Sequence, residues 1–429
     1  MTSRHPRGTP AGGQFAADRR PEGEATIDGT DLRLQQLLDH PVVAEIMRRF
    51  NDAGFPTFVV GGAIRSALRG EQPKDIDICT AATPEATATL LDDVGAVYPL
   101  GERFGTVAVN VEGDDFEVTT FRTEQYQEGS RHPDVEFAAS LEEDLARRDF
   151  TINAMALSAG GELIDPHGGR ADLDAGVIRA VGAPDARFVE DPLRIVRAIR
   201  FAAVLDFGFD RATFDAASRH RALLDTVSAE RFRAELDKIL ASDNPNALVD
   251  AATSAGALGA SKHLFGPLAH AAAASSARTH VPPPSRFADL VYRSGVDPMS
   301  LVQEMKRGRS EMAAVARVVD LLDDLDDGVD PRFLVRCNDD ATLAQAAILE
   351  PGPCIMFGRA WARAEQLRAP LPVNGRDIQA ELGFEGRDVG AALRRVEEAF
   401  IDADGELDRA GALRAAGGHR PAGSSARDA

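Results

Sequence analysis

The sequence predicts an α+β protein in which a small mixed α/β head is followed by an all-helical neck, body and tail. The β-prone runs are short and fall in the first third of the chain: Phe58–Val60, Ile76–Cys79, Thr106–Val111 and Phe116–Phe121. After about Arg148 this β signal fades. From Asp191 onward the segments have helical periodicity and are interrupted at Pro282–Pro284 and near Pro351–Pro353.

The length of 429 residues exceeds one ordinary core and indicates about two to four modules. Both ends are rich in Gly, Pro, Arg and Ala without periodicity, which is typical of disorder or fraying. We therefore expect a disordered arm over 1–30, a head over 31–157, a helical neck over 158–260, a body and tail over 261–410, and a frayed end over 411–429.

The composition, with 44% hydrophobic and 27% charged residues, is that of a globular protein. No apolar run approaches the roughly 18 residues of a membrane span, so no membrane partner is expected. The N-terminus lacks the apolar stretch of a secretory signal, and only three cysteines occur. A cytoplasmic protein is the consistent expectation.

The formal net charge of −20 argues against a protein that coats nucleic acid through bulk electrostatics. Any RNA binding must come from a local basic patch. Residues Lys306–Arg309 form the most compact basic cluster of the body, and the sequence leaves open whether it is a solvated helix end or an RNA contact.

Two aspartates two residues apart, Asp75 and Asp77, are the most informative short pattern. In a strand such residues point to the same face and lie about 6.6 Å apart along the chain. Paired carboxylates repel unless a cation lies between them, and Mg²⁺ suits oxygen ligands of this kind. Glu117, on a later strand, is a candidate third carboxylate. An isolated pattern of this kind is more often a solvated strand edge or turn.

A glycine pair, Gly61 and Gly62, ends the first β-prone run and leads into a helix that carries Arg65. Glycines at such a junction let backbone N–H groups approach phosphate oxygens, and a helix N-terminus adds positive potential. A tight turn that merely needs positive φ is the equally ready alternative.

A further helix is expected near Arg187–Phe201, with Ile195, Ile199 and Ala202 forming its buried stripe. Asp191 and Arg194, three residues apart, share another face. Asp191 before Pro192 also has the form of an N-cap with proline at the first helical position, in which case the arginines are simply solvated.

Taken in order, these motifs resemble the nucleotidyltransferase signature of class II CCA-adding enzymes (tRNA nucleotidyltransferases) and poly(A) polymerases. The segments that carry the resemblance are Val60–Arg65, Lys74–Asp77, Gly105–Val107, Glu117–Arg122, Arg147–Ala154 and Ile164–Gly169. The likeness is strong from Val59 to Phe201 and weak around Pro372–Ile378. Ser66 stands where such enzymes usually have Asp.

The resemblance implies addition of C, C and A to the 3′ end of tRNA from CTP and ATP, with release of pyrophosphate. It implies two Mg²⁺ ions held by Asp75 and Asp77 and assisted by Glu117, the catalytic residues. The expected nucleotide-binding residues are Gly61, Gly62, Arg65, Arg148, Asp191, Arg194, Arg197 and Arg200.

The Asp191–Arg194 pair matches the Glu-Asp-x-x-Arg motif by which the family reads the incoming base. Cytosine and adenine both present an amino donor beside a ring-nitrogen acceptor, which a carboxylate and a guanidinium complement. Uracil and guanine present the reverse order, so both protein groups would face like partners.

Two alternatives stay open. A poly(A) polymerase, or an enzyme that adds only CC or only A, has the same signature. The stretch Arg122–Asp149, with Glu124, Arg131–Pro133 and Leu141–Leu145, resembles the flexible loop of full CCA-adding enzymes and favours complete addition. A catalytically weak RNA-binding homologue is the second alternative, motivated by Ser66 and the acidic net charge.

Overall fold

The computed structural model describes residues 32–99, 105–125, 134–137, 140–260, 281–282, 285–349, 360 and 362–417. The chain divides into two compact units, Met1–Thr279 and His280–Ala429, which are described separately. Several expectations lie outside the described residues: the arm over 1–30, the loop residues Arg131–Pro133, and the last twelve residues of the frayed end, 418–429.

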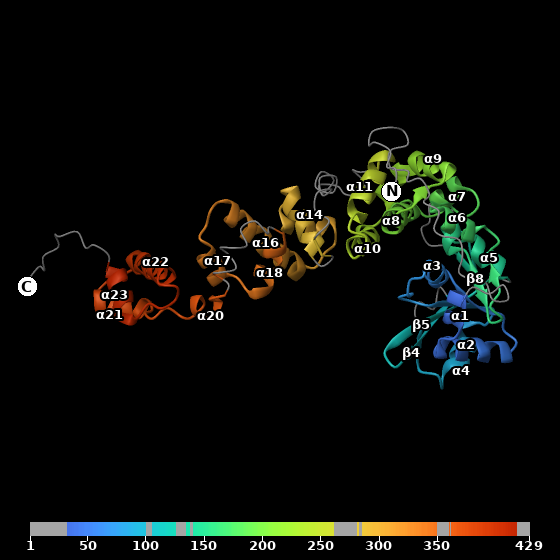
Figure 1. The fold of residues 1–429 in the computed structure, drawn as a ribbon, viewed down its shortest axis with the longest axis horizontal. Coiled ribbons are helices and arrows are strands. Elements are labelled where there is room, and N and C mark those ends of the chain that lie inside the picture. The colour runs from blue at the N-terminus through green and yellow to red at the C-terminus, as the bar shows by residue number, and fades with distance from the viewer. Residues whose placement is uncertain are drawn as a thin grey trace, which may run out of the picture. The chain divides into compact units, whose positions relative to one another are not determined.

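Within the described part of the first unit, the head contains a seven-stranded sheet of order β3-β4-β5-β2-β1-β8-β9 (Figure 1). In chain order its strands are β1 (Thr57–Val60), β2 (Asp77–Thr80), β3 (Ala96–Pro99), β4 (Thr106–Val111), β5 (Asp114–Thr120), β8 (Ala156–Ser158) and β9 (Leu163–Ile164). All neighbouring strands are antiparallel except β2 and β5, which run parallel.

One face of this sheet packs against a group of helices: α1 (Leu32–Leu38), α2 (Pro41–Asp52), α3 (Gly62–Leu68) and α4 (Pro84–Leu91). Val59, Ile78 and Val118 are register partners and are buried in this core. The opposite face is smaller, and there Val60 and Cys79 pack against Leu145 of α5 (Leu141–Ala146). Side chains alternate along a strand, so Asp77 belongs to this second face.

The sheet continues past Arg148, where the β signal of the sequence fades. β8 pairs with β1 near the middle of the sheet, and β9 extends the sheet to Ile164, past residue 157. β6 (Arg122–Gln125) pairs with β7 (Asp134–Phe137) in the head. β10 (Val177–Ile178) pairs with β11 (Gly208–Phe209) in the neck, so the neck is not wholly helical. These strands have two to four residues, which is too short for a periodicity to be recognised.

The short helix η2 (Thr151–Asn153) lies near the end of the head. The neck consists mainly of helices: α6 (Gly169–Ala175), α7 (Pro184–Glu190), α8 (Leu193–Leu205), α9 (Arg211–His220), η3 (Arg221–Thr226), α10 (Ala229–Leu240) and α11 (Ala247–Ala257). In α8 the predicted stripe of Ile195, Ile199 and Ala202 is buried, as expected. The helix begins at Leu193, one residue after Pro192, which an Asp191 cap predicted as the first helical residue.

The second unit is helical throughout its described residues: α14 (Arg286–Ser294), η7 (Pro298–Ser300), α15 (Leu301–Glu304), α16 (Arg309–Asp326), α17 (Pro331–Cys337), α18 (Asp340–Leu349), α20 (Ala364–Leu367), α21 (Gly375–Leu382), α22 (Arg387–Asp402) and α23 (Arg409–Gly417). Val373, Ile378 and Val396 centre a separate small core. The predicted fold class, an α/β head with a mostly helical remainder, is confirmed. Of the described helices, none is long and apolar enough to cross a membrane.

Candidate active site

Two carboxylates meet at the parallel strand pair of the head. Asp77, the first residue of β2, is the register partner of Glu117 in β5, so both side chains lie on the same face of the sheet. Asp75 is exposed and precedes the strand, because β2 begins at Asp77. The prediction that the two aspartates share one strand is therefore wrong, although Asp75 stays close enough to influence both other carboxylates.

The electrostatics of this group favour a bound cation. Burial raises the pKa of Asp77; Asp75 adds to this rise and Arg148 opposes it. Burial also raises the pKa of Glu117, and Asp77 and Asp75 raise it further. The carboxylates thus repel one another, which a divalent ion would relieve.

The number of ligands also limits what kind of metal site this is. In the part of the chain that the structure describes, no group of three or more His, Cys, Asp or Glu side chains is arranged to hold a metal by itself. Mg²⁺ usually binds one or two protein carboxylates and takes its other ligands from water and phosphate. The residues present fit an ion of that kind, completed by a substrate.

The side chain of an arginine packs close to the glycine turn. Gly61 lies between β1 and α3 with φ of 72°, a region that side-chain-bearing residues rarely adopt. A Cβ atom at this position would lie 2.8 Å from Nη1 of Arg148. Arg148 is half-buried and donates to the carbonyl of Asn153 (3.4 Å) and to Asp144 Oδ2 (3.2 Å). The backbone conformation thus favours glycine, and a side chain here would also displace the guanidinium of Arg148.

Asp144, which the sequence reading did not single out, holds both arginines of the Arg147–Arg148 pair. Its Oδ1 accepts from Arg147 (2.6 Å) and its Oδ2 from Arg148. Burial by itself would raise the pKa of Asp144, but the two guanidiniums outweigh it and keep the pKa below its usual range. The signal was available: Asp144 is three residues after Leu141, on the face of α5 that is buried.

Arg65, in the helix after the glycine turn, points into the neck. It donates to Asn153 Oδ1, and its guanidinium lies 5.1 Å from the ring centroid of Phe201. Desolvation, helped by nearby Arg200, lowers the pKa of Arg65 to about 10. Ser66 is half-buried, and its carbonyl accepts the N–H of Arg69.

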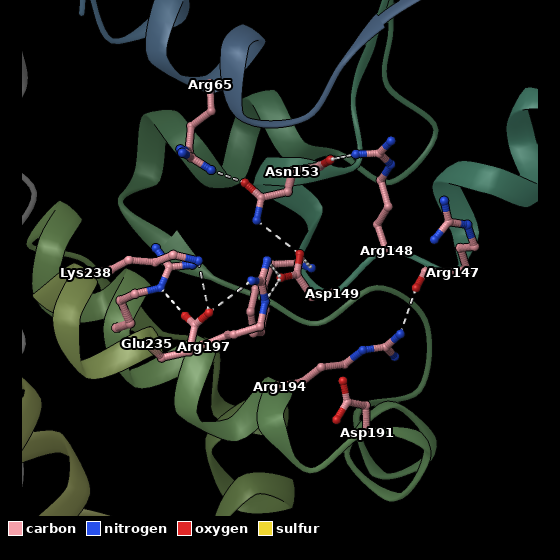
Figure 2. A network of polar contacts seen from close by, with 12 residues as sticks. Arg65, Arg147, Arg148, Asp149, Asn153, Asp191, Arg194, Arg197, Glu235 and Lys238 are labelled. Carbon is pink, nitrogen blue, oxygen red and sulfur yellow. Dashed lines mark hydrogen bonds and ion pairs between the residues drawn. The ribbon is translucent and has the colours of Figure 1, made fainter. Parts of the chain in front are cut away.

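From Asn153 a chain of polar contacts continues into the neck (Figure 2). Asn153 donates to Asp149 Oδ1 (3.0 Å), and Arg197 donates to Asp149 Oδ2 (2.8 Å). Arg197 also lies 3.5 Å from Glu235, which accepts from Nε of Arg200 at 2.5 Å. Burial disfavours the charged form of Asp149, yet Arg197 and Asn153 outweigh it and hold the pKa at about 2. Four elements, η2, α3, α8 and α10, are connected in this way.

Asp191 lies between α7 and α8 and is engaged on both oxygens. Its Oδ1 accepts the backbone N–H of Leu193 (3.1 Å), which is the contact of a helix cap. Nη1 and Nη2 of Arg231 donate to Oδ1 and Oδ2 at 3.1 and 2.8 Å. The N-cap position of α8 is Pro192, one residue later than predicted, but Asp191 still accepts the first N–H of the helix and in addition forms an ion pair that the sequence did not indicate.

Arg194 is buried, with 7% of its surface exposed, so the alternative that it is simply solvated is wrong. It donates to the backbone carbonyl of Arg147 (3.0 Å) and to the carboxylate of Glu190 (2.9 Å). A guanidinium has five N–H donors, so further donation to a ligand is available.

Sequence reasoning missed Arg231 and Glu235, both on α10. Glu235 carries one usable signal, because it lies four residues before Ile239, on the apolar face of the helix, where a carboxylate needs a partner. Arg231 shows no such pattern, since its partner is 40 residues away.

The basic cluster at 306–309 is partly structural. Arg307 is 7% exposed, pairs with Glu311, and lies 3.8 Å from the ring centroid of Phe287. This arginine is therefore a packing residue of the second unit and is not solvated, whereas an RNA contact by the cluster stays a prediction.

Comparison with known families matches two regions of the first unit. Residues 57–179 match the family described as the poly A polymerase head domain. Residues 206–267 match the family described as the probable RNA and SrmB-binding site of polymerase A. The matched regions contain most of the site residues described above, from the glycine turn to Arg148 and from α9 to α11.

Relatives and solved structures agree with these matches. A CCA-adding enzyme of Streptococcus thermophilus is 46% identical over 196 residues, 46% of this chain and 48% of that enzyme. One of Streptococcus pyogenes is 44% identical over the same length. The chain thus spans about half the length of the curated relatives that it matches.

Among solved structures, the Bacillus stearothermophilus CCA-adding enzyme in complex with CTP has a TM-score of 0.69 at 29% identity, covering 85% of this chain and 94% of that one. The Thermotoga maritima CCA-adding enzyme complexed with tRNA has a TM-score of 0.62 at 22% identity and covers 90% and 97% of the two chains, which shows the shared fold.

Proposed function

We propose that this chain, whose head and neck belong to the family of CCA-adding enzymes and poly(A) polymerases, completes the 3′ end of tRNA by adding C, C and A from CTP and ATP. The observation that carries the proposal is the parallel register of Asp77 and Glu117 beside the glycine turn at Gly61. Carboxylates and phosphate-binding backbone are brought together there by the sheet itself. Because tRNA, CTP and ATP are cytoplasmic molecules, a cytoplasmic location is part of the proposal.

In the proposed reaction, the 3′-hydroxyl oxygen of the RNA forms a bond to the α-phosphorus of the nucleotide. The bond from that phosphorus to the bridging oxygen breaks, and pyrophosphate leaves. The backbone N–H of Gly62, at the start of α3, binds a phosphate oxygen, because the N–H of Gly61 donates to the carbonyl of Met155 and shapes the turn. The bond from the N–H of Gly61 to the carbonyl of Met155 fixes this turn and Arg148 packs close to it, so the phosphates meet a preorganised backbone.

Enzymes of this family generally use divalent metal ions. We propose Mg²⁺ here, held by Asp77 and Asp75 and assisted by Glu117. An ion at these carboxylates would supply charge neutralisation at the phosphates and activation of the attacking hydroxyl. The supporting observation is that Asp77 and Glu117 are register partners with Asp75 nearby, where burial and mutual repulsion raise the pKa of Asp77 and Glu117.

The base is read, in this proposal, by Asp191 and Arg194. The carboxylate accepts the exocyclic amino group of cytosine or adenine, and the guanidinium donates to the adjacent ring nitrogen. Arg194 is fixed by the carbonyl of Arg147 and by Glu190, so its position is determined before a nucleotide binds. Three further arginines either support the base pocket, through their contacts with Asn153, Asp149 and Glu235, or bind the phosphates: Arg65, Arg197 and Arg200.

The test is addition of single nucleotides to defined RNAs. Purified protein with Mg²⁺ is given tRNA transcripts that end before the CCA, after the first C and after the second C, each with one of the four NTPs. Complete CCA addition predicts C on the first two substrates and A only on the third. Long A tails on any RNA indicate a poly(A) polymerase; C without A, or A without C, indicates partial addition. An absence of incorporation from every substrate would refute the proposal in favour of a weak RNA-binding homologue.

A second test separates base reading from capping. If Asp191 and Arg194 read the base, changing either to Ala lowers discrimination of CTP over UTP by about 1–3 kcal/mol. If Asp191 is only a cap, Asp191→Ala lowers stability by about 1 kcal/mol and leaves the CTP to UTP ratio unchanged. Melting temperature and the four incorporation rates, measured on both variants, decide between these outcomes.

A further inference from the structure

The Asp191 carboxylate is held by a residue that lies outside all the motifs recognised in the sequence. Arg231, in the first turn of α10, binds it through two nearly parallel N–H···O contacts of 3.1 and 2.8 Å. The Asp191 side chain is 19% exposed and that of Arg231 44% exposed, so the pair lies at the edge of the neck and not in its core.

This two-point contact with Arg231 limits how many further hydrogen bonds the Asp191 carboxylate can accept. A carboxylate has about four lone-pair positions, two on each oxygen. On Oδ1 one is used by the N–H of Leu193 and one by Nη1 of Arg231, and on Oδ2 one is used by Nη2. A single position on Oδ2 remains for a ligand. Because a two-point contact with a planar guanidinium fixes the plane of the carboxylate, this remaining position has a fixed direction.

Arg231 itself comes from a fixed helix. Glu235, one turn later on α10, is buried and accepts from Arg200 of α8 at 2.5 Å. Ser228 caps α10 by accepting the backbone N–H of Arg231. The guanidinium therefore reaches Asp191 from a helix that is anchored to α8, the same helix that carries Arg194.

We propose that Arg231 is a positioning residue for base selection: it holds the Asp191 carboxylate so that a single directed acceptor meets the amino group of the incoming base, without contacting the base itself. The inference rests on the proposed function, because it assumes that Asp191 reads the base. The alternative is a latch, meaning that Arg231 blocks Asp191 and must leave before a nucleotide binds. The positioning role does not need this movement, because the remaining lone-pair position on Oδ2 can accept an N–H donor while the ion pair is intact.

Two variants test this proposal. Arg231→Gln removes both the positive charge and the two-point contact with Asp191, whereas Arg231→Lys keeps the charge and loses the two-point contact. Arg211→Gln is the matched control, because Arg211 is exposed and pairs with Asp215 on α9. The readouts are affinity for CTP and UTP by calorimetry without RNA, kcat and KM for each NTP with tRNA, and melting temperature. A second set repeats Arg231→Gln in an Asp191→Ala background.

We expect Arg231→Gln to lower the CTP over UTP preference by about tenfold, mainly through a higher KM for CTP, the size of one base contact. Arg231→Lys should give an intermediate loss, because an ammonium attracts the carboxylate but does not fix its plane. In the Asp191→Ala background the effect of Arg231→Gln should disappear, as it must if Arg231 acts through Asp191.

Three outcomes would overturn the inference: a lower melting temperature with unchanged preference, a higher kcat/KM for CTP in Arg231→Gln, which indicates a latch, or an undiminished effect without Asp191. The binding measurement keeps the inference separate from the proposed function. A wild-type protein that fails to extend tRNA but binds CTP over UTP, and loses that preference in Arg231→Gln, would refute the function and support the inference.

Discussion

Replacing Glu235 by Gln removes one negative charge from the neck while keeping the shape of the side chain. Glu235 is 3% exposed and lies 2.5 Å from Arg200, 3.2 Å from Lys238 and 3.5 Å from Arg197. Arg197 retains Asp149 as a partner in the variant. Arg200 would keep its contact with the ring of Phe201 but would lose its counter-ion.

The magnitude follows from that loss. Removing one partner of a buried ion pair costs about 3–5 kcal/mol. The Gln carbonyl can still accept one hydrogen bond from Arg200, which offsets part of this, so we expect a loss of about 2–4 kcal/mol. For a large unit this corresponds to a fall in melting temperature of about 4–16 °C, at about 2–4 °C per kcal/mol.

The pH dependence has a definite sign. Burial alone would raise the pKa of Glu235, but Arg200, Arg197 and Lys238 outweigh it, so the folded-state pKa lies below its usual range. The charge therefore stabilises the protein fully above the unfolded pKa of about 4.3, and this contribution is lost as pH falls through the lower folded value. The difference between wild type and variant should be complete at pH 7 and should shrink below about pH 4.

The assay is urea unfolding at pH 7 and again at the most acidic pH at which the wild type remains folded, with Glu162→Gln as the control at an exposed position. Coincident fluorescence and circular dichroism curves would justify a two-state treatment. A loss at pH 7 no larger than that of the control would refute the reasoning, and so would a difference that grows as pH falls.

Other substitutions test separate parts of the molecule. Asp77→Ala should lower nucleotide addition by on the order of a hundredfold or more with the melting temperature retained, because metal ions supply several kcal/mol of transition-state stabilisation; near-normal turnover would contradict the metal assignment. Gly61→Ala should lower stability by about 1–3 kcal/mol, since it forces positive φ and moves Arg148; equal unfolding midpoints would argue against this. Arg307→Ala should lower the stability of the second unit by about 1–2 kcal/mol through lost contact with Phe287; a salt-dependent loss of RNA affinity without destabilisation would indicate a binding role instead.

The sequence predicted those parts of the fold and the site that depend on local patterns. The strands at Thr57–Val60 and Thr106–Val111 are runs of β-branched and apolar residues, and the Gly61 turn follows directly from its glycine pair. In α8 the buried stripe has ordinary helical spacing. Each of these features is determined by neighbours within a few residues, which is why it could be recognised without the structure.

The rest depends on contacts between distant segments. β8 is too short to show a pattern and is a strand only because it pairs with β1, about 100 residues earlier in the chain. Arg231 has ordinary surroundings on α10, and only the packing of α10 against α8 brings it to Asp191. The burial of Arg307 has the same cause, since three basic residues grouped around a glycine gave no sign that one of them packs on an aromatic ring.

The parallel pairing of β2 with β5 also determines where this protein tolerates changes in length. Glu117 faces Asp77 because of a register fixed along the whole strand pair, from Asp77–Glu117 to Thr80–Thr120. Residues inserted at the β4–β5 turn, near Gly113, leave that register intact. A single residue inserted inside β5 ahead of Glu117 would turn its carboxylate to the opposite face, among the buried side chains that pack on α2 and α4, or force the strand to bulge. Among related sequences, insertions and deletions in this hairpin are therefore expected at the β4–β5 turn and not within the strand β5.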